Sequence, residues 1–175
     1  MKRVLLGLGS NRNFNHNTPE ELLSFAREEL SRIMENCVFS SVYKTKAMYV
    51  EDQEDFYNMA AIGYVSDDTD AFDFLKTINK IEAKYGRDRD KEIRFGPRSL
   101  DIDIELFGNE TINTPELQIP HVRMEERMFV LIPTLEILND SADELIRAKY
   151  EKCLLKLQKE EQWKKQKSQI IQKLQ

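Results

Sequence analysis

The stretch Arg94-Phe95-Gly96-Pro97-Arg98-Ser99-Leu100-Asp101-Ile102-Asp103-Ile104-Glu105-Leu106 places a basic loop, broken by glycine and proline, directly before an alternating segment. From Leu100 to Leu106 every even position is aliphatic, which is the period of two of a strand with one buried face. Asp101 and Asp103 are therefore expected to share the opposite face. Two such carboxylates, roughly 6–7 Å apart at the backbone, can converge on hard cations such as Mg²⁺, which prefers a few carboxylates together with nucleotide phosphates. The stretch predicts a site for metal and phosphate.

The composition is that of a globular protein with a single core. The chain has 175 residues, of which 41% are hydrophobic and 33% charged, so it can bury a core without disulfides or a structural metal. Cys37 and Cys153 form no ligand spacing and no disulfide framework, which favours a reducing compartment. Gly7 and Gly9 cut short the apolar stretch near the amino terminus, so it reads as neither a signal segment nor a membrane span. We therefore expect a cytoplasmic protein.

Charge is distributed unevenly along the chain. The formal net charge of −5 argues against a general nucleic-acid binder, because such proteins need a surplus of cations to neutralise phosphates. Residues 141–175 carry nine Lys or Arg and five Asp or Glu, so the acidic surplus lies in the rest of the chain. Within that acidic body, five cations form a local basic patch. They are Arg87, Arg89, Lys91, Arg94 and Arg98.

Periodicity and turn signals predict an alternation of strands and helices. Strands are expected at 2–8, 37–43, 56–65, 100–106 and 111–113. A helix should begin after Thr18, where an N-cap, a proline and a glutamate three residues on combine, and a second should follow the turn at 66–69 and stop at Gly86. A brief helix is expected at 125–132, ending before Pro133. The order predicts an α+β, ferredoxin-like (βαββαβ) antiparallel sheet with two helices covering one face.

The sequence after Asn139 is rich in charged residues and has the spacing of a helix. Residues 141–144 form a capping box that opens a charged helical stretch, expected to reach the carboxyl terminus. We therefore divide the chain into a catalytic domain, 1–140, and a charged, helical carboxyl-terminal extension, 141–175. Since no sustained heptad repeat is present, the extension is expected to pack on the domain and not to form a coiled coil.

Four segments in order resemble the 6-hydroxymethyl-7,8-dihydropterin pyrophosphokinase (HPPK) family. They are 7–11, then 43–45 through 55–58, then 86–89 through 94–103, and finally 120–121 through 127–129. The third is specific, and together they span about residues 4–138. The resemblance implies a ferredoxin-like fold that transfers the pyrophosphoryl group of ATP to the hydroxymethyl group of 6-hydroxymethyl-7,8-dihydropterin. The products would be AMP and the pterin diphosphate, a step of folate biosynthesis.

The resemblance also implies which residues handle the nucleotide. Asp101 and Asp103 would bind two Mg²⁺ ions, and arginines would neutralise the phosphates with two-pronged contacts that lysine cannot reproduce. The catalytic positions would be Arg87, Arg89, Arg98, Asp101 and Asp103. The nucleotide-binding positions would be Asn79, Glu82, Arg89, Arg98, Ile104, His121 and Arg127. Asn79 stands where the family can have a glutamine, and Glu82 could equally form a salt bridge on the helix surface.

A second set of positions would bind the pterin. Phe56 and Phe129 would sandwich the flat ring, and Asn58 would read its edge, because an amide supplies both a donor and an acceptor. The full set is Gly9, Thr45, Lys46, Met48, Phe56, Asn58, Phe95 and Phe129. Lys46 stands where proline is common in the family, Phe95 where tryptophan is typical and Val122 where an aromatic residue can follow the histidine. The basic loop is also one residue longer than the family pattern between Arg89 and Arg94.

Other readings of these residues stay open on sequence alone. An Asp-x-Asp strand can be a solvated sheet face, Phe56 and Phe129 can be core aromatics, and no residue stands out as a general base. The sequence argues against a Rossmann site, because Gly7-x-Gly9 lacks the third glycine of that fingerprint. The rival functions are a nucleotidyltransferase that releases pyrophosphate, and a non-catalytic module that binds RNA or a partner through the basic tail. We expect a monomer that binds ATP and the pterin, without nucleic acid or membrane.

Overall fold

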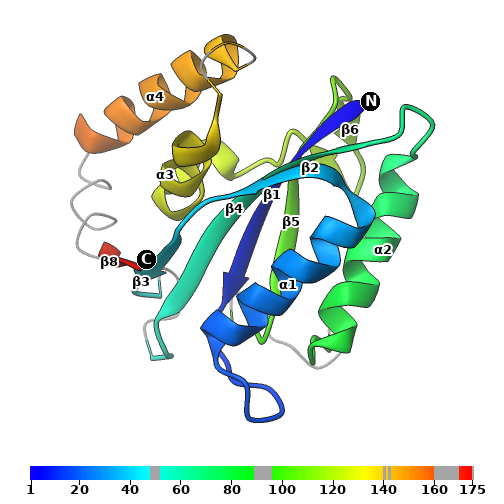
Figure 1. Ribbon diagram of the computed structural model, residues 1–175. Helices are drawn as coiled ribbons and strands as arrows, with labels where there is room; N and C mark the ends of the chain where they lie inside the picture. Colours follow the sequence, from blue (N-terminus) through cyan, green and yellow to red (C-terminus); the bar gives the residue numbers. More distant parts are fainter. Residues whose placement is uncertain (48–51, 89–95, 140, 142, 160–169, 175) are drawn as a thin grey trace.

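The computed structural model describes residues 1–47, 52–88, 96–139, 141, 143–159 and 170–174. Its main feature is a six-stranded antiparallel sheet with the order β5-β1-β4-β3-β8, in which β2 also pairs with β4 (Figure 1). The strands are β1 (Lys2–Ser10), β2 (Glu35–Phe39), β3 (Val42–Thr45), β4 (Phe56–Val65), β5 (Asp101–Phe107) and β8 (Ile170–Leu174). A separate two-stranded ribbon pairs β6 (Ile112–Asn113) with β7 (Gln118–Ile119).

Two helices cover one face of the sheet, as predicted. Helix α1 (Pro19–Ile33) begins with the expected capping box, in which Thr18 and Glu21 satisfy each other's backbone amides. Helix α2 (Ala71–Lys84) is capped by Asp70, one residue beyond the expected turn. Gly86 follows with a φ of 88°. Both helices pack on the sheet through a core of leucine, isoleucine and methionine side chains that includes Leu6, Ile78 and Ile104.

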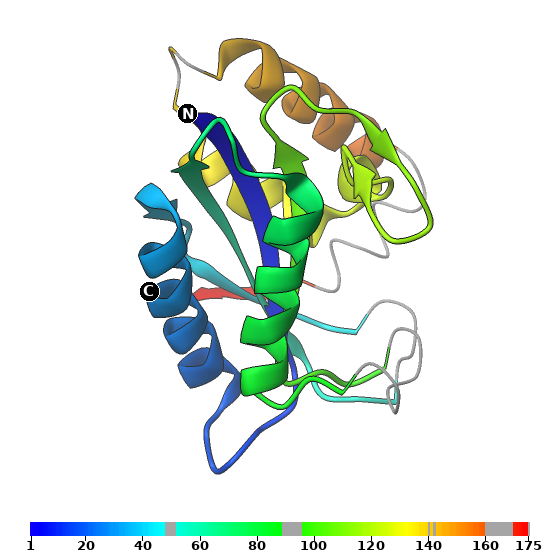
Figure 2. The ribbon, with the colours of Figure 1, turned by 90° about the vertical axis from the view of Figure 1, so that its right-hand side faces the viewer.

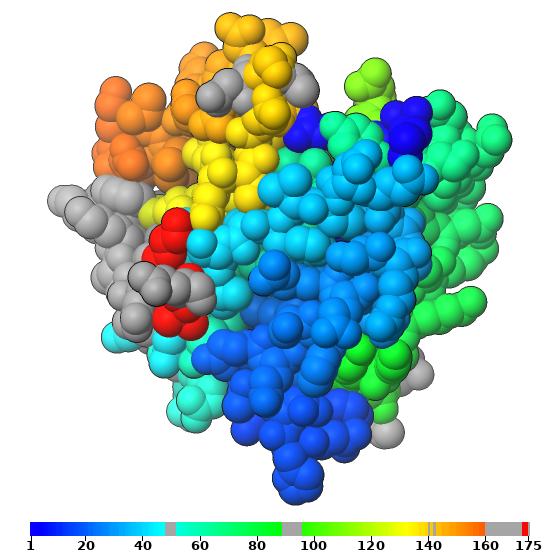
Figure 3. Space-filling model, viewed as in Figure 1, coloured from blue at the N-terminus to red at the C-terminus, as the bar shows by residue number. Residues whose placement is uncertain are grey.

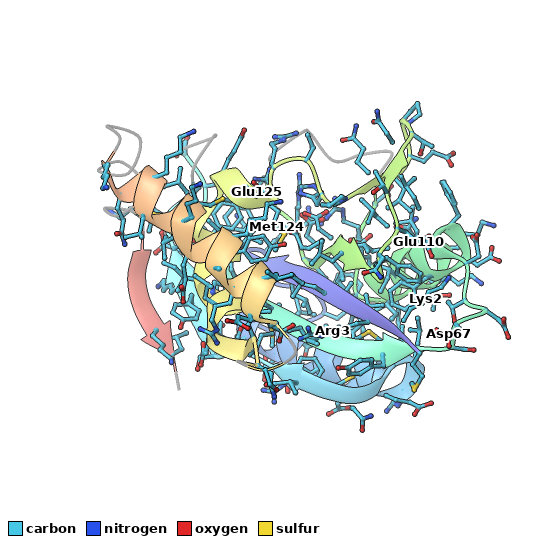
Figure 4. All side chains as sticks on the ribbon, turned by 90° about the horizontal axis from the view of Figure 1, so that it is seen from above. Lys2, Arg3, Asp67, Glu110, Met124 and Glu125 are labelled. Atoms are coloured by element: carbon cyan, nitrogen blue, oxygen red, sulfur yellow. The ribbon has the colours of Figure 1, made fainter. Side chains whose placement is uncertain are left out.

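The opposite face is covered by the last third of the chain. The short 3₁₀ helix η1 (Met124–Glu126), helix α3 (Met128–Ile137) and helix α4 (Glu144–Lys159) pack there through a second core that includes Leu5, Leu131 and Tyr150. In Figure 1 this layer lies on the other side of the strands from α1 and α2, and Figure 2 views the molecule from the side of α2. In Figure 4, α4 lies close to Met124 and Glu125 of η1, and its amino-terminal end lies near Arg3, which forms an ion pair with Asp143.

The structure confirms the βαββαβ order and differs from the sequence prediction at four places. The strand expected at 37–43 is divided into β2 and β3, because the Ser40 hydroxyl accepts the hydrogen bond of the Ala60 amide. Pro133 lies inside α3 and does not end it, since burial of this apolar helix outweighs one missing backbone donor. The alternation of residues 100–106 fails at Leu106, which belongs to the second core. The helix expected to reach the carboxyl terminus is described from Glu144 to Lys159, and Ile170–Leu174 form a strand instead.

The carboxyl-terminal end forms a strand. β8 pairs with β3, and Lys173 forms an ion pair with Glu136 of α3 at 3.0 Å. Figure 3 shows β8, in red, on the surface beside β3 and α3. Within the carboxyl-terminal extension, β8 therefore adds a strand at the edge of the sheet, and α4 contributes to the second core. Among the described helices, none is both long enough and apolar enough to cross a membrane.

Candidate active site

A pocket opens at the end of the sheet where β1 finishes. Because β1 runs antiparallel to β4 and β5, its carboxyl end lies beside the amino ends of those two strands. The pocket is open to solvent on one side and is lined by charged, amide and aromatic side chains, which suits a small-molecule substrate. Its lining comes from β1, β3, β4, β5, α3 and the adjoining loops. The residues are Gly7, Leu8, Gly9, Thr45, Lys46, Gln53, Phe56, Asn58, Met59, Arg98, Asp101, Asp103, Glu105, Arg127, Phe129 and Val130.

Asp101 opens β5 and is held by two arginines. Arg87 Nη1 donates to Asp101 Oδ1 at 2.7 Å and also to the Leu100 carbonyl at 3.2 Å. Arg98 donates to the other carboxylate oxygen. Burial disfavours the charged form of Asp101, but attraction to Arg98 and Arg87 outweighs it, so its pKa is lowered. Asp101 is therefore an ionised carboxylate at neutral pH.

Asp103, two residues further on the same face, has a different environment. Within the described residues it makes no hydrogen bond or ion pair. Burial and repulsion from Asp101 raise the pKa of Asp103 to about 7. A divalent cation between the two side chains would favour the ionised form of Asp103 and would offset the cost of burying its charge. The pair of carboxylates is therefore suited to binding a metal ion.

The loop before β5 is held in place by the residues that end β1. The Ser10 hydroxyl donates to the Ser99 carbonyl, and Asn11 both accepts from the Arg98 amide at 2.7 Å and donates to the Arg98 carbonyl at 2.9 Å. The Asn11 side chain also donates to Gln53 Oε1 at 3.1 Å. Asn11 thus connects the loop of Arg98 to the loop between β3 and β4.

Six of the eight predicted pterin positions line the pocket. Asn58 Nδ2 donates to Thr45 Oγ1 at 2.8 Å, and both side chains are buried. A side chain at Gly9 would lie 3.2 Å from Asn58 Oδ1, so glycine keeps the approach to this amide open. Phe56, Lys46 and Phe129 complete the group on the pocket wall. Met48 and Phe95 lie outside the described residues.

Of the predicted nucleotide-binding positions that the structure describes, only some line the pocket. Arg98 and Arg127 line the pocket, and the Arg127 guanidinium lies 5.5 Å from the centre of the Phe129 ring. Asn79 lies on α2, partly buried, and its Oδ1 atom has no hydrogen-bond partner within the described residues. Ile104 packs into the core beneath α1 and α2, which leaves its backbone as the only part that can face a ligand. Arg89 lies outside the described residues.

Glu82 has a structural role that the sequence did not reveal. Its side chain is fully buried and accepts the Ile102 amide of β5 at 2.8 Å, which ties α2 to the strand of the two aspartates. Because this side chain is buried, Glu82 does not lie on the helix surface, as the alternative reading assumed. The Glu82 carboxylate thus accepts the hydrogen bond of a buried backbone amide in β5, which would otherwise have no partner.

His121 and Glu105 lie side by side at the inner end of the site. The His121 Nδ1 atom is 3.5 Å from Glu105 Oε2, and the His121 amide donates to the Glu105 carbonyl at 3.0 Å. Burial, together with Arg127 and Arg123, lowers the pKa of His121 to about 4. Burial and the neighbouring Asp103 raise the pKa of Glu105 well above its ordinary value. Glu105, Asn11 and Gln53 were not among the predicted site residues, although the acidic Glu105 two positions after Asp103 was a visible signal.

The arrangement suits the transfer of a phosphoryl-type group between two small molecules. One side of the pocket offers arginines and acidic side chains, which match phosphates and their metal ions. The other offers a buried amide between aromatic side chains, which matches a flat heterocycle with alternating donors and acceptors. Both halves face the same space, so the two ligands would meet inside it.

Comparisons with known proteins agree with this geometry. The profile of the family described as 7,8-dihydro-6-hydroxymethylpterin-pyrophosphokinase (HPPK) matches residues 5–139. The 2-amino-4-hydroxy-6-hydroxymethyldihydropteridine pyrophosphokinases of Haemophilus influenzae and Pseudomonas aeruginosa are 37% and 35% identical, with 80% of this chain covered in each case and 84% and 83% of theirs. The enzyme of the same name from Bacillus subtilis is 45% identical over 56% of both chains.

Solved structures support the same fold. The Plasmodium falciparum HPPK-DHPS with pteroate superposes with a TM-score of 0.64 at 15% identity, covering 91% of this chain. The chain spans 45% of that longer protein, so the likeness concerns the fold of one part of it. With the family profile covering most of its length and its relatives matching in sequence, this chain belongs to the 7,8-dihydro-6-hydroxymethylpterin-pyrophosphokinase family.

Proposed function

We propose that the protein transfers the pyrophosphoryl group of ATP to the hydroxymethyl group of 6-hydroxymethyl-7,8-dihydropterin in folate biosynthesis. The products are AMP and the pterin diphosphate. The observation that carries the proposal is the lining of one pocket. Asp101, which is bound by arginines, and Asp103 face the same space as the hydrogen-bonded pair Asn58 and Thr45. Each half suits one substrate, and the family match covers both halves.

The reaction is a displacement at the β-phosphorus of ATP. The pterin hydroxyl oxygen loses its proton to water and forms a bond to this phosphorus, while the bond to the oxygen shared with the α-phosphorus breaks and AMP leaves with that oxygen. Negative charge spreads over the phosphoryl oxygens, so positioning and charge neutralisation supply most of the rate. Arg98 and Arg127 line the pocket where those oxygens would lie, and Arg87 holds Asp101 in its ionised form. Arg89 completes the predicted set of cations.

Two Mg²⁺ ions are part of the proposal, and Asp101 and Asp103 would hold them. Within the described residues no three His, Cys, Asp or Glu side chains are grouped to bind a metal. Phosphate oxygens and water would therefore complete the coordination, as is usual for Mg²⁺ in nucleotide enzymes. When bound, the ions would neutralise the triphosphate and draw the two substrates into line.

The pterin would enter between Phe56 and Phe129, with its edge against Asn58. The Thr45 hydroxyl accepts one Asn58 amide hydrogen, which fixes the orientation of the amide before the ring arrives. The amide oxygen and the second amide hydrogen remain for the ligand. Action as a monomer in the cytoplasm remains a prediction.

The products of the reaction distinguish this function from its rivals. The protein is incubated with Mg²⁺, ATP and the pterin, with a control that lacks the pterin, and the nucleotides are resolved. AMP that forms only with the pterin, without free pyrophosphate, supports the proposal. Release of pyrophosphate would indicate a nucleotidyltransferase. No consumption of ATP, together with salt-dependent RNA binding that is lost on truncation after Asn139, would indicate the non-catalytic module.

A further inference from the structure

Glu105 is a buried acid that the reaction as described does not use. Its side chain is 0% exposed, and neither carboxylate oxygen has a hydrogen-bond partner within the described part of the chain. Burying a carboxyl group without a hydrogen-bond partner lowers the stability of the fold, because the group loses its contacts with water. An apolar side chain of the same size would carry no such penalty. Its presence in the pocket wall requires a ligand or neighbour that uses it.

The local fold makes room for this side chain. In the pairing of β1 with β5, Leu5 lies opposite Leu106 and Leu6 opposite Ile104, so Glu105 is the extra residue of a β-bulge. A bulge redirects a side chain that regular alternation would place elsewhere. On the neighbouring strand, a Cβ atom at Gly7 would lie 2.9 Å from Glu105 Oε1. The bulge and the glycine together accommodate a carboxyl group at this position.

The nearest polar neighbour is the imidazole ring of His121. Its Nδ1 atom is 3.5 Å from Glu105 Oε2 and, within the described residues, has no other hydrogen-bond partner. The backbone hydrogen bond from the His121 amide to the Glu105 carbonyl keeps the two residues adjacent. A small rotation of the ring brings Nδ1 within hydrogen-bond distance of the carboxyl group. The side chain of His121 is 21% exposed, so the rest of the ring can reach a ligand.

We propose that Glu105 is a positioning residue whose carboxyl group donates a hydrogen bond to the Nδ1 atom of His121, so that Nε2 keeps its hydrogen and faces the nucleotide phosphates. The inference rests on the proposed function, because it assumes that His121 contacts ATP. Fixing one ring nitrogen selects a single tautomer and orientation, much as outer partners fix the histidines of metal sites. Glu105 would therefore act on ATP binding without touching ATP.

Nitrogen NMR of the histidine ring tests this pairing without any need for catalysis. The chain has two histidines, and the His16→Asn variant leaves His121 alone. In that background we expect one tautomer of His121 with a hydrogen-bonded Nδ1. Glu105→Met, which keeps the volume and removes the hydrogen-bond donor, should give a mixture of tautomers, and Glu105→Gln, whose amide can donate to Nδ1, should restore the single form. A His121 spectrum unchanged by Glu105→Met would overturn the proposal.

Kinetics then connect the pairing to the nucleotide. Loss of one such hydrogen bond should raise the ATP KM of Glu105→Met about 3- to 10-fold with little change in kcat, and Glu105→Gln should recover most of it. In a His121→Ala background, Glu105→Met should have no further effect. An increase that persists in that background would show that Glu105 acts through another group. A wild-type protein that makes no AMP would refute the proposed function, while the NMR result would still decide the pairing.

Discussion

Asp101 and Asp103 share one face of β5 but differ in what surrounds them. Two arginines bind Asp101 and lower its pKa, whereas burial and the charge of Asp101 raise the pKa of Asp103 to about 7. The pKa values of two identical side chains thus shift in opposite directions because arginines are hydrogen-bonded to Asp101, whereas the weaker attraction of Arg127 and Arg98 does not offset the burial of Asp103. The metal-binding capacity of the pair should depend on the protonation of Asp103.

The pKa of Asp103 predicts how pH affects the metal-free protein. Because the folded-state pKa of about 7 exceeds the ordinary 3.8, the folded protein binds more protons than the unfolded chain between these values. The stabilising contribution of Asp103 is therefore complete below about pH 4 and is lost as the pH rises through about 7. Denaturant unfolding between pH 5 and 8 should show wild type losing free energy of unfolding relative to Asp103→Asn. Equal pH profiles for the two proteins would contradict the shifted pKa.

Substitution of the two aspartates that we propose as metal ligands should strongly lower turnover. Asp101→Ala and Asp103→Ala each remove one of the two proposed protein ligands, and a defect in kcat of roughly 10²–10³-fold is expected at saturating Mg²⁺. Direct Mg²⁺ titration in the presence of a non-hydrolysable ATP analogue should show weaker metal binding in both variants. Near-normal kcat in either variant would refute the two-metal proposal.

Arg98 is expected to be intolerant of lysine. Arg98→Lys keeps the charge that binds Asp101 but loses the planar, two-pronged contact with a phosphate, so kcat/KM should fall about 10- to 100-fold. Arg32→Lys on the exposed end of α1 provides the matched control, because its ion pairs lie at the surface. If Arg98→Lys matches the control, Arg98 serves only to hold the loop and Asp101.

Among the helices and strands, the sequence correctly predicted those features that are determined by neighbouring residues in the chain. The capping box at Thr18 and the strand Phe56–Val65 appear where the sequence indicated them. The bulge at Glu105, the division at Ser40 and the continuation of α3 through Pro133 depend on neighbouring strands and on burial, which residue spacing does not encode. The same holds for the site, where the two aspartates were predictable but the loop contacts of Asn11 were not.

The turn after α2 sets the position of Arg87 and depends on Gly86. A Cβ atom at Gly86 would lie 2.2 Å from the Phe14 ring, and the residue has a φ of 88°. Gly86→Ala should therefore lower the free energy of unfolding by about 2 kcal/mol or more. Gly108→Ala is the control, since Gly108 also has a positive φ but its nearest side-chain neighbour would be 3.5 Å away. Thermal or denaturant unfolding should rank Gly86→Ala below Gly108→Ala, and equal losses would contradict the steric argument.

At the scale of the whole molecule, both sheet faces are covered by helices, so the site lies at one end of the sheet. The ferredoxin-like order predicted the layer of α1 and α2, but not the second layer, because η1, α3 and α4 have no place in the βαββαβ repeat. The addition of β8 was also unpredictable, since a short tail strand is selected by the free edge of β3 and not by its own sequence. The described parts of the carboxyl-terminal extension, α4 and β8, therefore pack on the rest of the fold.

Removal of the tail strand should expose the edge of β3. Truncation after Lys159 deletes β8 and its ion pair with Glu136, leaving the unpaired backbone of β3 available to other chains. Sedimentation velocity should show concentration-dependent association of the truncated protein, and its thermal midpoint should fall by a few degrees. The Lys173→Gln variant, which loses only the ion pair, should remain unassociated. A truncated protein that behaves like wild type would show that β8 contributes little to the sheet.

The fate of the β-phosphorus tests the central claim most directly. ATP labelled with ³²P at the β position is incubated with the protein, Mg²⁺ and 6-hydroxymethyl-7,8-dihydropterin, and the products are separated. The account predicts that the β label moves to the pterin as its diphosphate while α label in a parallel reaction stays in AMP. Recovery of the β label as free pyrophosphate or ADP, or its retention in ATP, would contradict pyrophosphoryl transfer in this pocket.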